Sequence, residues 1–272
     1  MTTEMMTAGD GCPIAYRWDG EASLPVLVLS NSIATDHRMW DDIVPDLAKV
    51  RRVLRYDTRG HGASGAPRGA YSLDRLGRDV IELLDHLGVE TFDFCGLSLG
   101  GMVGQWLGVR AGERIDRLIL SNTSPYLGPA GQWDDLIAGL ERDGDMDAMA
   151  EMFLGNWFPP AFRDTHPGTV DAFRRTILAT PPHGLAGCFA AVRDMDLRQT
   201  NRLIRTSTLV VGGDHDSVTL PAHSREIADA IPDAGLVLLP GVHILNVELP
   251  DAFRHVVNDF LIDGRITDRQ PW

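Results

Sequence analysis

Residues 91–110 of the 272-residue chain decide the fold and read TFDFCGLSLGGMVGQWLGVR. Thr91 to Cys95 has the apolar character of a buried strand, and Leu99 to Arg110 has the composition of a helix that ends near Gly112. Between them, the segment 96–100 matches the pattern G-x-S-x-G, which carries a nucleophile when a strand precedes it and a helix follows. The sharp turn would lift the hydroxyl of Ser98 above the edge of a sheet, where flanking glycines avoid a Cβ clash.

The predicted helix after Ser98 carries a stripe of small residues. Gly100, Gly104 and Gly108 recur every four residues, although each glycine costs about 1 kcal/mol of helix propensity against alanine. The stripe therefore predicts close packing of this helix on a sheet, and the helix N-terminus would stabilise negative charge near Ser98. Serine also caps helices in glycine-containing turns, so a nucleophile needs partners elsewhere in the chain.

Outward from this stretch, strand and helix signals alternate. Short apolar runs predict strands, and apolar residues spaced three and four apart predict helices. A glycine such as Gly88 marks the C-terminal end of a predicted helix. The alternation predicts the α/β class, with a mostly parallel central sheet and helices on both faces. The predicted strands are Val26–Leu29, Val53–Tyr56, Thr91–Cys95, Ile115–Leu120, Thr208–Val211 and Leu236–Leu239, and the predicted helices are 73–87, 99–110, 220–231 and 250–262, with a further apolar stripe at Trp40, Ile43, Val44, Leu47 and Val50.

The alternation stops at about Pro125 and resumes near residue 201. The segment between contains helical stretches separated by prolines and is rich in adaptable apolar side chains, among them Met152, Phe153 and Trp157. We predict a core domain of residues 1–126 and 201–272, with residues 127–200 as a helical cap over it, because ligand sites favour apolar clefts between domains. Helical packing without a role in binding is the alternative.

A catalytic serine needs a base and an acid, which follow the nucleophile in the order acid then histidine in this strand–turn–helix setting. His243 follows the last predicted strand in a glycine-containing loop and is the predicted base, whereas His223 and His255 lie in predicted helices. Asp214 and Asp216 both follow the strand Thr208–Val211, and either can be the acid.

Backbone amides are the expected donors to a developing oxyanion. One is the N–H of Leu99, next to the nucleophile. The other comes from the loop after the first predicted strand, where Ser32 is favoured and its neighbour Ile33 is the alternative.

The composition restricts the kinds of molecule that the protein is expected to bind. The formal net charge of -13 argues against nucleic acid as a binding partner. The three cysteines form no CxxC pair, and no HExxH motif occurs, so we expect neither a disulfide framework nor a metal site. No apolar run approaches the roughly 18–20 residues of a membrane span, and no signal peptide is recognisable. We expect a cytoplasmic enzyme with a small-molecule ester or lactone as its partner; the sequence leaves the oligomeric state open.

The chain resembles the α/β-hydrolase superfamily over nearly its whole length, and more narrowly the 3-oxoadipate enol-lactonases of the β-ketoadipate route for aromatic breakdown. The resemblance rests on the segments at Leu29–Ser32, Leu54–Ser64, Gly96–Gly108 and Arg193–Arg198, and on His243 followed by Asn246-Val247-Glu248.

The resemblance implies a catalytic triad of Ser98, Asp216 and His243, no cofactor, and an acyl-serine route that opens an enol-lactone. It assigns His61 a structural role only. Asn156 precedes the cap residue Trp157 where such lactonases often have arginine.

Substrate binding is therefore expected from Trp157, with Arg163, Arg193 or Arg198 as the partner of a substrate carboxylate. A carboxylesterase or lactonase with a neutral substrate is the alternative, and a non-catalytic ligand receptor of the same fold is a more distant one.

Overall fold

The computed structural model describes residues 3–264, and these form an eight-stranded sheet in the order β1-β2-β4-β3-β5-β6-β7-β8. β1 and β2 run antiparallel to their neighbours, and the remaining pairs are parallel. The mostly parallel α/β sheet predicted from the sequence is thus confirmed. The strands are β1 (Glu4–Thr7), β2 (Pro13–Asp19), β3 (Val26–Ser30), β4 (Arg52–Tyr56), β5 (Phe92–Leu97), β6 (Ile115–Ser121), β7 (Ser207–Gly213) and β8 (Gly235–Leu239).

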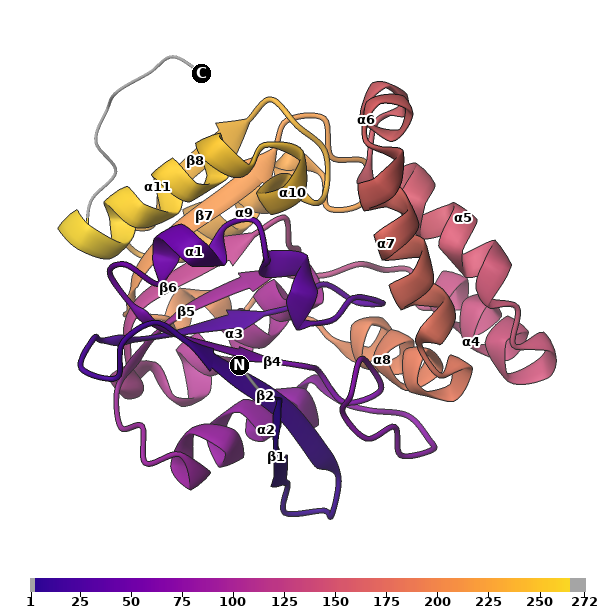
Figure 1. Cartoon of the computed structure of the whole chain (residues 1–272), viewed down its shortest axis with the longest axis horizontal. Helices are drawn as coiled ribbons and strands as arrows, with labels where there is room; N and C mark the ends of the chain where they lie inside the picture. Colours follow the sequence, from indigo (N-terminus) through magenta and orange to yellow (C-terminus); the bar gives the residue numbers. More distant parts are fainter. Residues whose placement is uncertain (1–2, 265–272) are drawn as a thin grey trace.

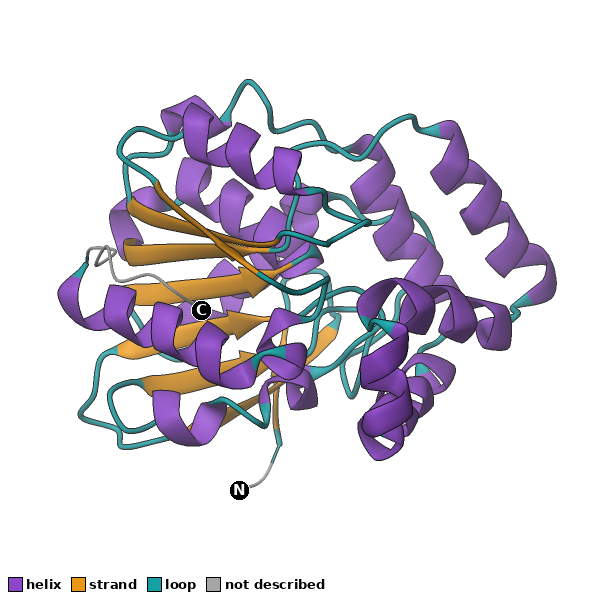
Figure 2. Ribbon diagram, turned by 90° about the horizontal axis from the view of Figure 1, so that it is seen from above, coloured by secondary structure: helices purple, strands orange, loops and turns teal. Residues whose placement is uncertain are grey.

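Helices cover both faces of the sheet (Figure 2). α1 (Val44–Leu47) and α11 (Pro250–Asp263) pack together on one face. α2 (Leu73–His86), α3 (Leu99–Arg110) and α9 (Pro221–Ala230) lie on the other. The central strands β3 and β5 are therefore buried on both faces, which is why they are apolar except for Ser30 and Asp93.

Two parts of the core differ from the sequence prediction. The edge strands β1 and β2 were not predicted, because they are short and mix polar with apolar residues. The apolar stripe from Trp40 to Val50 is buried at four of its five positions but is not one helix. It is split into a 3₁₀ turn (η1, His37–Trp40) and α1, because Pro45 lies in the first turn of α1 and cannot continue a preceding helix.

The glycine stripe of α3 packs against the sheet as predicted. A Cβ at Gly104 would lie 2.8 Å from the side chain of Leu120, and one at Gly108 would lie 3.0 Å from Leu118. Both partners are on β6, which contacts α3 along with β5. The small residues therefore bring the helix behind Ser98 into closer contact with the strands than any larger residue would allow.

Between β6 and β7 the described chain forms helices and a short 3₁₀ turn but no strand. These helices are α4 (Gly131–Asp143), α5 (Met146–Trp157), α6 (Pro160–Thr165), α7 (Pro167–Ala179) and α8 (Pro182–Asp194), followed by η3 (Asn201–Leu203). α4 packs on α8, α5 packs on α7, and all five lie together beyond one end of the sheet (Figure 1). The position is that predicted for a cap, and the division into two domains remains a prediction.

The helices of residues 3–264 include none that combines the length and apolar composition needed to cross a membrane.

Candidate active site

The candidate site lies where the order of the parallel strands reverses. β3 has β4 on one side and β5 on the other, so connections leave this point in opposite directions. In open α/β sheets, ligands bind outside the carboxyl ends of the strands at such a switch point. The loop after β3 carries Ile33 and the turn after β5 carries Ser98, so both stand at this position.

Ser98 sits in a strained turn with φ 58° and ψ -114°. The turn is held by a hydrogen bond from the Ser98 N–H to the carbonyl of Ser121 on β6, at 2.9 Å. A Cβ at Gly96 would lie 2.1 Å from the carbonyl oxygen of Gly100, and one at Gly100 would lie 2.1 Å from that of Ser30. Only glycine fits at these two positions, so the backbone on both sides of Ser98 is fixed by steric exclusion.

His243 and Asp216 form a buried pair at the ends of β8 and β7. Nδ1 of His243 lies 2.8 Å from Oδ2 of Asp216, and both side chains are almost fully buried. The other carboxylate oxygen accepts from the N–H groups of Val218 (2.8 Å) and Thr219 (3.0 Å). The carboxylate thus orients the ring, leaving Nε2 as the nitrogen available for proton transfer.

Asn122 is a third residue in contact with this pair, and it was not identified from the sequence. Its side-chain amide donates to Oδ2 of Asp216 (3.0 Å) and to the carbonyl of Val242 (2.8 Å), next to His243. Burial by itself raises the pKa of Asp216, but the charge of His243 and the donated hydrogen bonds lower that pKa to about 2. Asn122 lies just after β6 with φ 41°, a left-handed conformation that asparagine tolerates. A lone asparagine after a strand is the only signal in the sequence.

The other candidates for acid and base lie elsewhere. Asp214 is exposed and pairs with His215. His255 pairs with Asp259, 3.3 Å away along α11. His223 lies on α9, where partial burial lowers its pKa. Of the two aspartates left open by the sequence, Asp216 is the one that meets His243.

The two candidates for the second oxyanion donor, Ser32 and Ile33, have different surroundings. The N–H of Ser32 lies 3.3 Å from Sδ of Met39, and Ser32 is not among the residues that line the pocket at Ser98. Ile33 and Leu99 do line it. These contacts favour Ile33, the alternative donor, over Ser32, and the oxyanion role of either amide remains a prediction.

His61 holds the loop that carries Ile33. Its Nε2 accepts a hydrogen bond from the N–H of Ala34 (2.8 Å), and its Nδ1 lies 3.2 Å from the carbonyl of Arg59. Burial lowers the pKa of His61, which favours the neutral ring that can accept at Nε2. Ala34 has φ 56°, a conformation that a non-glycine residue needs support to keep. The structural role that the resemblance implied for His61 thus has a specific partner.

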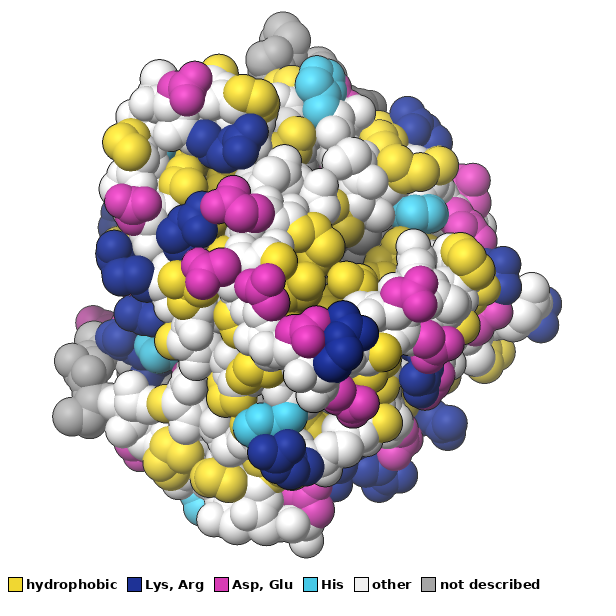
Figure 3. Space-filling view, turned by 90° about the vertical axis from the view of Figure 1, so that its right-hand side faces the viewer, with side chains coloured by type: hydrophobic (Ala, Val, Ile, Leu, Met, Phe, Trp, Pro, Cys, Tyr) yellow, Lys and Arg dark blue, Asp and Glu magenta, His cyan; other side chains and the backbone are white. Residues whose placement is uncertain are grey.

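A cavity of about 280 Å³ joins the serine, the histidine and the cap. Ser98, Leu99 and His243 line it from the core side, while α4, α5 and α8 supply its walls. Figure 3 looks onto the molecule from the side of these helices, and hydrophobic side chains gather in a hollow near the middle of that face. The cavity is lined from the cap by Leu127, Gln132, Trp133, Leu136, Met152, Phe153, Asn156, Trp157, Phe189 and Val192.

Of the expected substrate-binding residues, only Trp157 reaches this cavity. Arg193 lies 2.9 Å from Asp134 and 2.7 Å from Asp194, and it faces another surface of α8. Neither Arg163 nor Arg198 lines the cavity, and Arg198 is paired with Asp196 at 2.6 Å. The structure thus places none of the three arginines at the cavity, and acidic neighbours engage two of them. A role for any of them in holding a substrate carboxylate remains a prediction.

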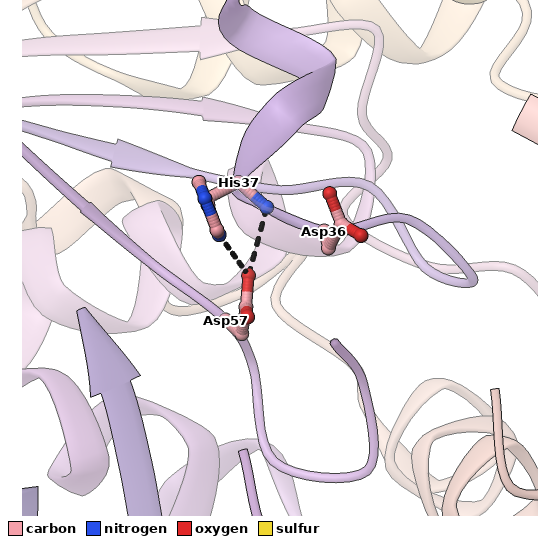
Figure 4. A group of neighbouring side chains, drawn as sticks. All are labelled: Asp36, His37 and Asp57. Carbon is pink, nitrogen blue, oxygen red and sulfur yellow. Dashed lines mark hydrogen bonds and ion pairs between the residues drawn. The ribbon is translucent and has the colours of Figure 1, made fainter. Parts of the chain in front are cut away.

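Asp36, His37 and Asp57 offer ligand atoms within 4.8 Å of one another (Figure 4). None of the three is among the residues that line the cavity at Ser98. Their polar atoms already have partners in the chain. Oδ1 of Asp57 accepts from the N–H of His37 (2.8 Å) and lies 2.9 Å from its Nδ1. Asp36 pairs with the guanidinium of Arg38 at 2.6 Å. These contacts give the group a structural role in joining the loop after β3 to that after β4, and we assign it no metal.

The geometry has direct parallels among known proteins. Residues 25–250 match the alpha/beta hydrolase fold family. The chain belongs to the α/β-hydrolase family. It is 37% identical to 3-oxoadipate enol-lactonase 2 of Acinetobacter baylyi over 93% of this chain and 94% of that protein.

Solved structures agree with this family membership. The hydrolase is similar to the crystal structure of a hydrolase from Pseudomonas aeruginosa PA01, with 53% identity, a TM-score of 0.94, and coverage of 96% of this chain and 98% of that one. It is also similar to the enol-lactonase from Burkholderia xenovorans LB400, with 39% identity, a TM-score of 0.92, and coverage of 95% and 99%. Both the fold and the resemblance inferred from sequence are thus confirmed.

Proposed function

We propose that this α/β hydrolase cleaves an enol-lactone or similarly activated ester through an acyl-serine intermediate on Ser98. The observation that supports it most is the buried pair of His243 and Asp216, 2.8 Å apart, beside a cavity that also contains the strained serine. The relatives named as enol-lactonases support the enol ester as the reacting group. The 3-oxoadipate enol-lactone, an intermediate of the β-ketoadipate pathway, is the first substrate to assay.

In the acylation step, Oγ of Ser98 attacks the lactone carbonyl carbon while Nε2 of His243 takes the hydroxyl proton. The tetrahedral intermediate collapses, and the bond between the carbonyl carbon and the ring oxygen breaks. The leaving enolate takes the proton from His243 and becomes an enol, which rearranges to the ketone. Asp216 stays ionised throughout, because its pKa lies near 2, and it stabilises the imidazolium form of His243.

In the deacylation step, a water molecule attacks the acyl carbon and gives a proton to His243. The bond to Oγ then breaks, Ser98 recovers its proton from His243, and the carboxylic acid product leaves. Both tetrahedral intermediates place negative charge on the former carbonyl oxygen. The N–H groups of Ile33 and Leu99, with the N-terminus of α3, would stabilise that charge, and each such donor typically contributes about 10²–10³ in turnover.

Replacement of Ser98 by alanine tests the proposal. Ser98→Ala should lower the hydrolysis of enol-lactone and of short p-nitrophenyl esters by about 10⁵-fold or more, to the background of the oxyanion donors. Ser207→Ala is the control, since Ser207 is exposed at the start of β7 and does not line the cavity. Activity of Ser98→Ala within tenfold of the parent would remove the serine mechanism. A folded parent protein that binds esters without steady turnover would instead identify a receptor.

Neutral esters are the second candidate substrate class. The observation that favours them is the lining of the cavity, which among the described residues includes no lysine and no arginine. Comparison of the enol-lactone with short neutral esters separates the two classes.

A further inference from the structure

We infer that this hydrolase prefers an uncharged substrate, a neutral ester or lactone with an apolar body and an uncharged polar end, over the anionic 3-oxoadipate enol-lactone. The inference rests on the proposed function, because it concerns the cavity at Ser98. It deepens that proposal by assigning a chemical class to the part of the substrate that does not react, and it assigns Asn156 and Gln132 to the recognition of the polar end.

One wall of the cavity is aromatic. Phe153 stacks on Trp157 with ring centroids 4.8 Å apart, and Phe189 lies 6.2 Å from Phe153. All three side chains line the cavity and are buried. An ionised carboxylate placed against these rings would lose its hydration without gaining a partner, which costs several kcal/mol. This wall therefore suits an alkyl or ring substituent.

No cation reaches the cavity to offset that cost. His243 is the only ionisable residue among the described residues that line it, and its ring is engaged by Asp216. The nearby guanidinium of Arg193 is held by Asp134 and Asp194 on the exposed side of the cap. The formal net charge of -13 further opposes the approach of an anion. The lack of a free cation at the cavity and the net negative charge of the protein thus both disfavour an anionic substrate.

The remaining polar groups of the cavity are neutral and exposed. Asn156, Gln132 and Ser217 line it and are solvent-accessible. Gln132 donates one bond to the carbonyl of Leu127 (3.0 Å), which leaves its side-chain oxygen as an acceptor. The side chain of Asn156 makes no hydrogen bond or ion pair within residues 3–264, so both ends of its amide can bind a ligand. Amides of this kind pair with a ketone, ester or amide group of a substrate.

A matched pair of lactones tests the inference. The 3-oxoadipate enol-lactone as its free acid and as its methyl ester have the same reacting ring and differ in one charge. Ring-opened products should be separated, so that cleavage of the methyl ester itself is not counted. The parent enzyme should show a kcat/KM for the methyl ester at least about tenfold above that for the free acid, since tenfold corresponds to about 1.4 kcal/mol.

Two arginine variants extend the test. Asn156→Arg places a guanidinium at the cavity and should lower the preference for the methyl ester by about tenfold, because hydrogen bonds to charged groups contribute about 1.5–3 kcal/mol. Gly155→Arg adds the same charge at the neighbouring position, where a Cβ meets open space and the residue does not line the cavity. That control should leave the preference unchanged.

The outcomes separate the inference from the proposed function. A parent enzyme that opens the free acid with a preference for the methyl ester below tenfold overturns the inference and leaves the serine mechanism standing. An unchanged preference in Asn156→Arg overturns the assignment of the polar end to Asn156. Failure to hydrolyse both lactones and short neutral esters removes the proposed function, and the inference with it.

Discussion

The core side and the cap side of the cavity are built by different means. On the core side, Ser98 and His243 are fixed by short hydrogen bonds and by glycines that exclude any other residue. On the cap side, Phe153, Trp157 and Phe189 are held by packing alone. The difference suggests that the core side determines the reaction and the cap side determines which molecule undergoes it. Variants in the two regions should therefore change different kinetic constants.

After replacement of the nucleophile itself, the largest effect should come from the acid. Asp216→Asn keeps the shape of the side chain but removes the charge that orients His243, and kcat should fall about 10³–10⁴-fold. Asp214→Asn is the matched control, two residues away and exposed, and should retain activity within about twofold. Steady-state assays on one neutral ester, with circular dichroism to verify folding, measure both. Loss of activity in Asp214→Asn alone would show that the acid is misassigned.

Asn122 should have the next largest effect, again on the core side. Asn122→Gly keeps the left-handed backbone but removes the donor to Asp216, and kcat should fall about ten- to hundredfold. KM should stay near the parent value, since Asn122 does not line the cavity. Asn122→Asp should lose more, because it places a second carboxylate beside Asp216. If both variants lose the same activity, Asn122 is only a packing residue.

A cap variant should behave in the opposite way. Phe189→Ala removes a buried ring from the cavity wall and should lower the free energy of unfolding by about 3–5 kcal/mol. KM for a neutral ester should rise about tenfold while kcat changes little, because the side chain does not touch the reacting atoms. Leu178→Ala is the control, exposed on α7 and away from the cavity. A fall in kcat that matches that of Asp216→Asn would contradict the division between the two regions.

The smallest effect is a pH dependence of stability. The pKa of Asp216 is lowered in the folded state from 3.8 to about 2, so its contribution is present above about pH 4 and is lost as the pH falls toward 2. Between pH 5 and pH 3, the contribution of Asp216 to the free energy of unfolding should fall by about 1 kcal/mol. Urea unfolding of the parent and of Asp216→Asn at both pH values isolates it. The expected result is a stability difference between the two proteins that narrows at pH 3; a constant difference would contradict the assigned pKa shift.

The local parts of the fold were predictable from sequence, and the long-range parts were not. The helix 99–110, the turn at Ser98 and the loop carrying His243 follow from residues adjacent in the chain. The preference for Ile33 over Ser32 depends on the N–H of Ser32 donating to Sδ of Met39 and on the N–H of Ala34 donating to His61, which no local pattern reveals.

The arginines also depend on long-range contacts that the sequence does not reveal. The sequence offered three of them as partners of a carboxylate, but Arg193 pairs across 59 positions with Asp134. An arginine on a cap helix can point into the cavity or toward solvent, and the acidic side chains near it determine which. Asn122 was missed for a related reason, because its partners Asp216 and Val242 come from other strand ends.

Covalent labelling tests the central claim most directly. An uncharged alkyl phosphonate with a good leaving group should react once per chain, and peptide mapping by mass spectrometry should place the label on Ser98. The label should be absent from Ser98→Ala, slow to form in Asp216→Asn, and normal in Asp214→Asn. A label on another residue, or equal labelling of the parent and Ser98→Ala, would contradict the claim that Ser98 is the nucleophile activated by His243 and Asp216.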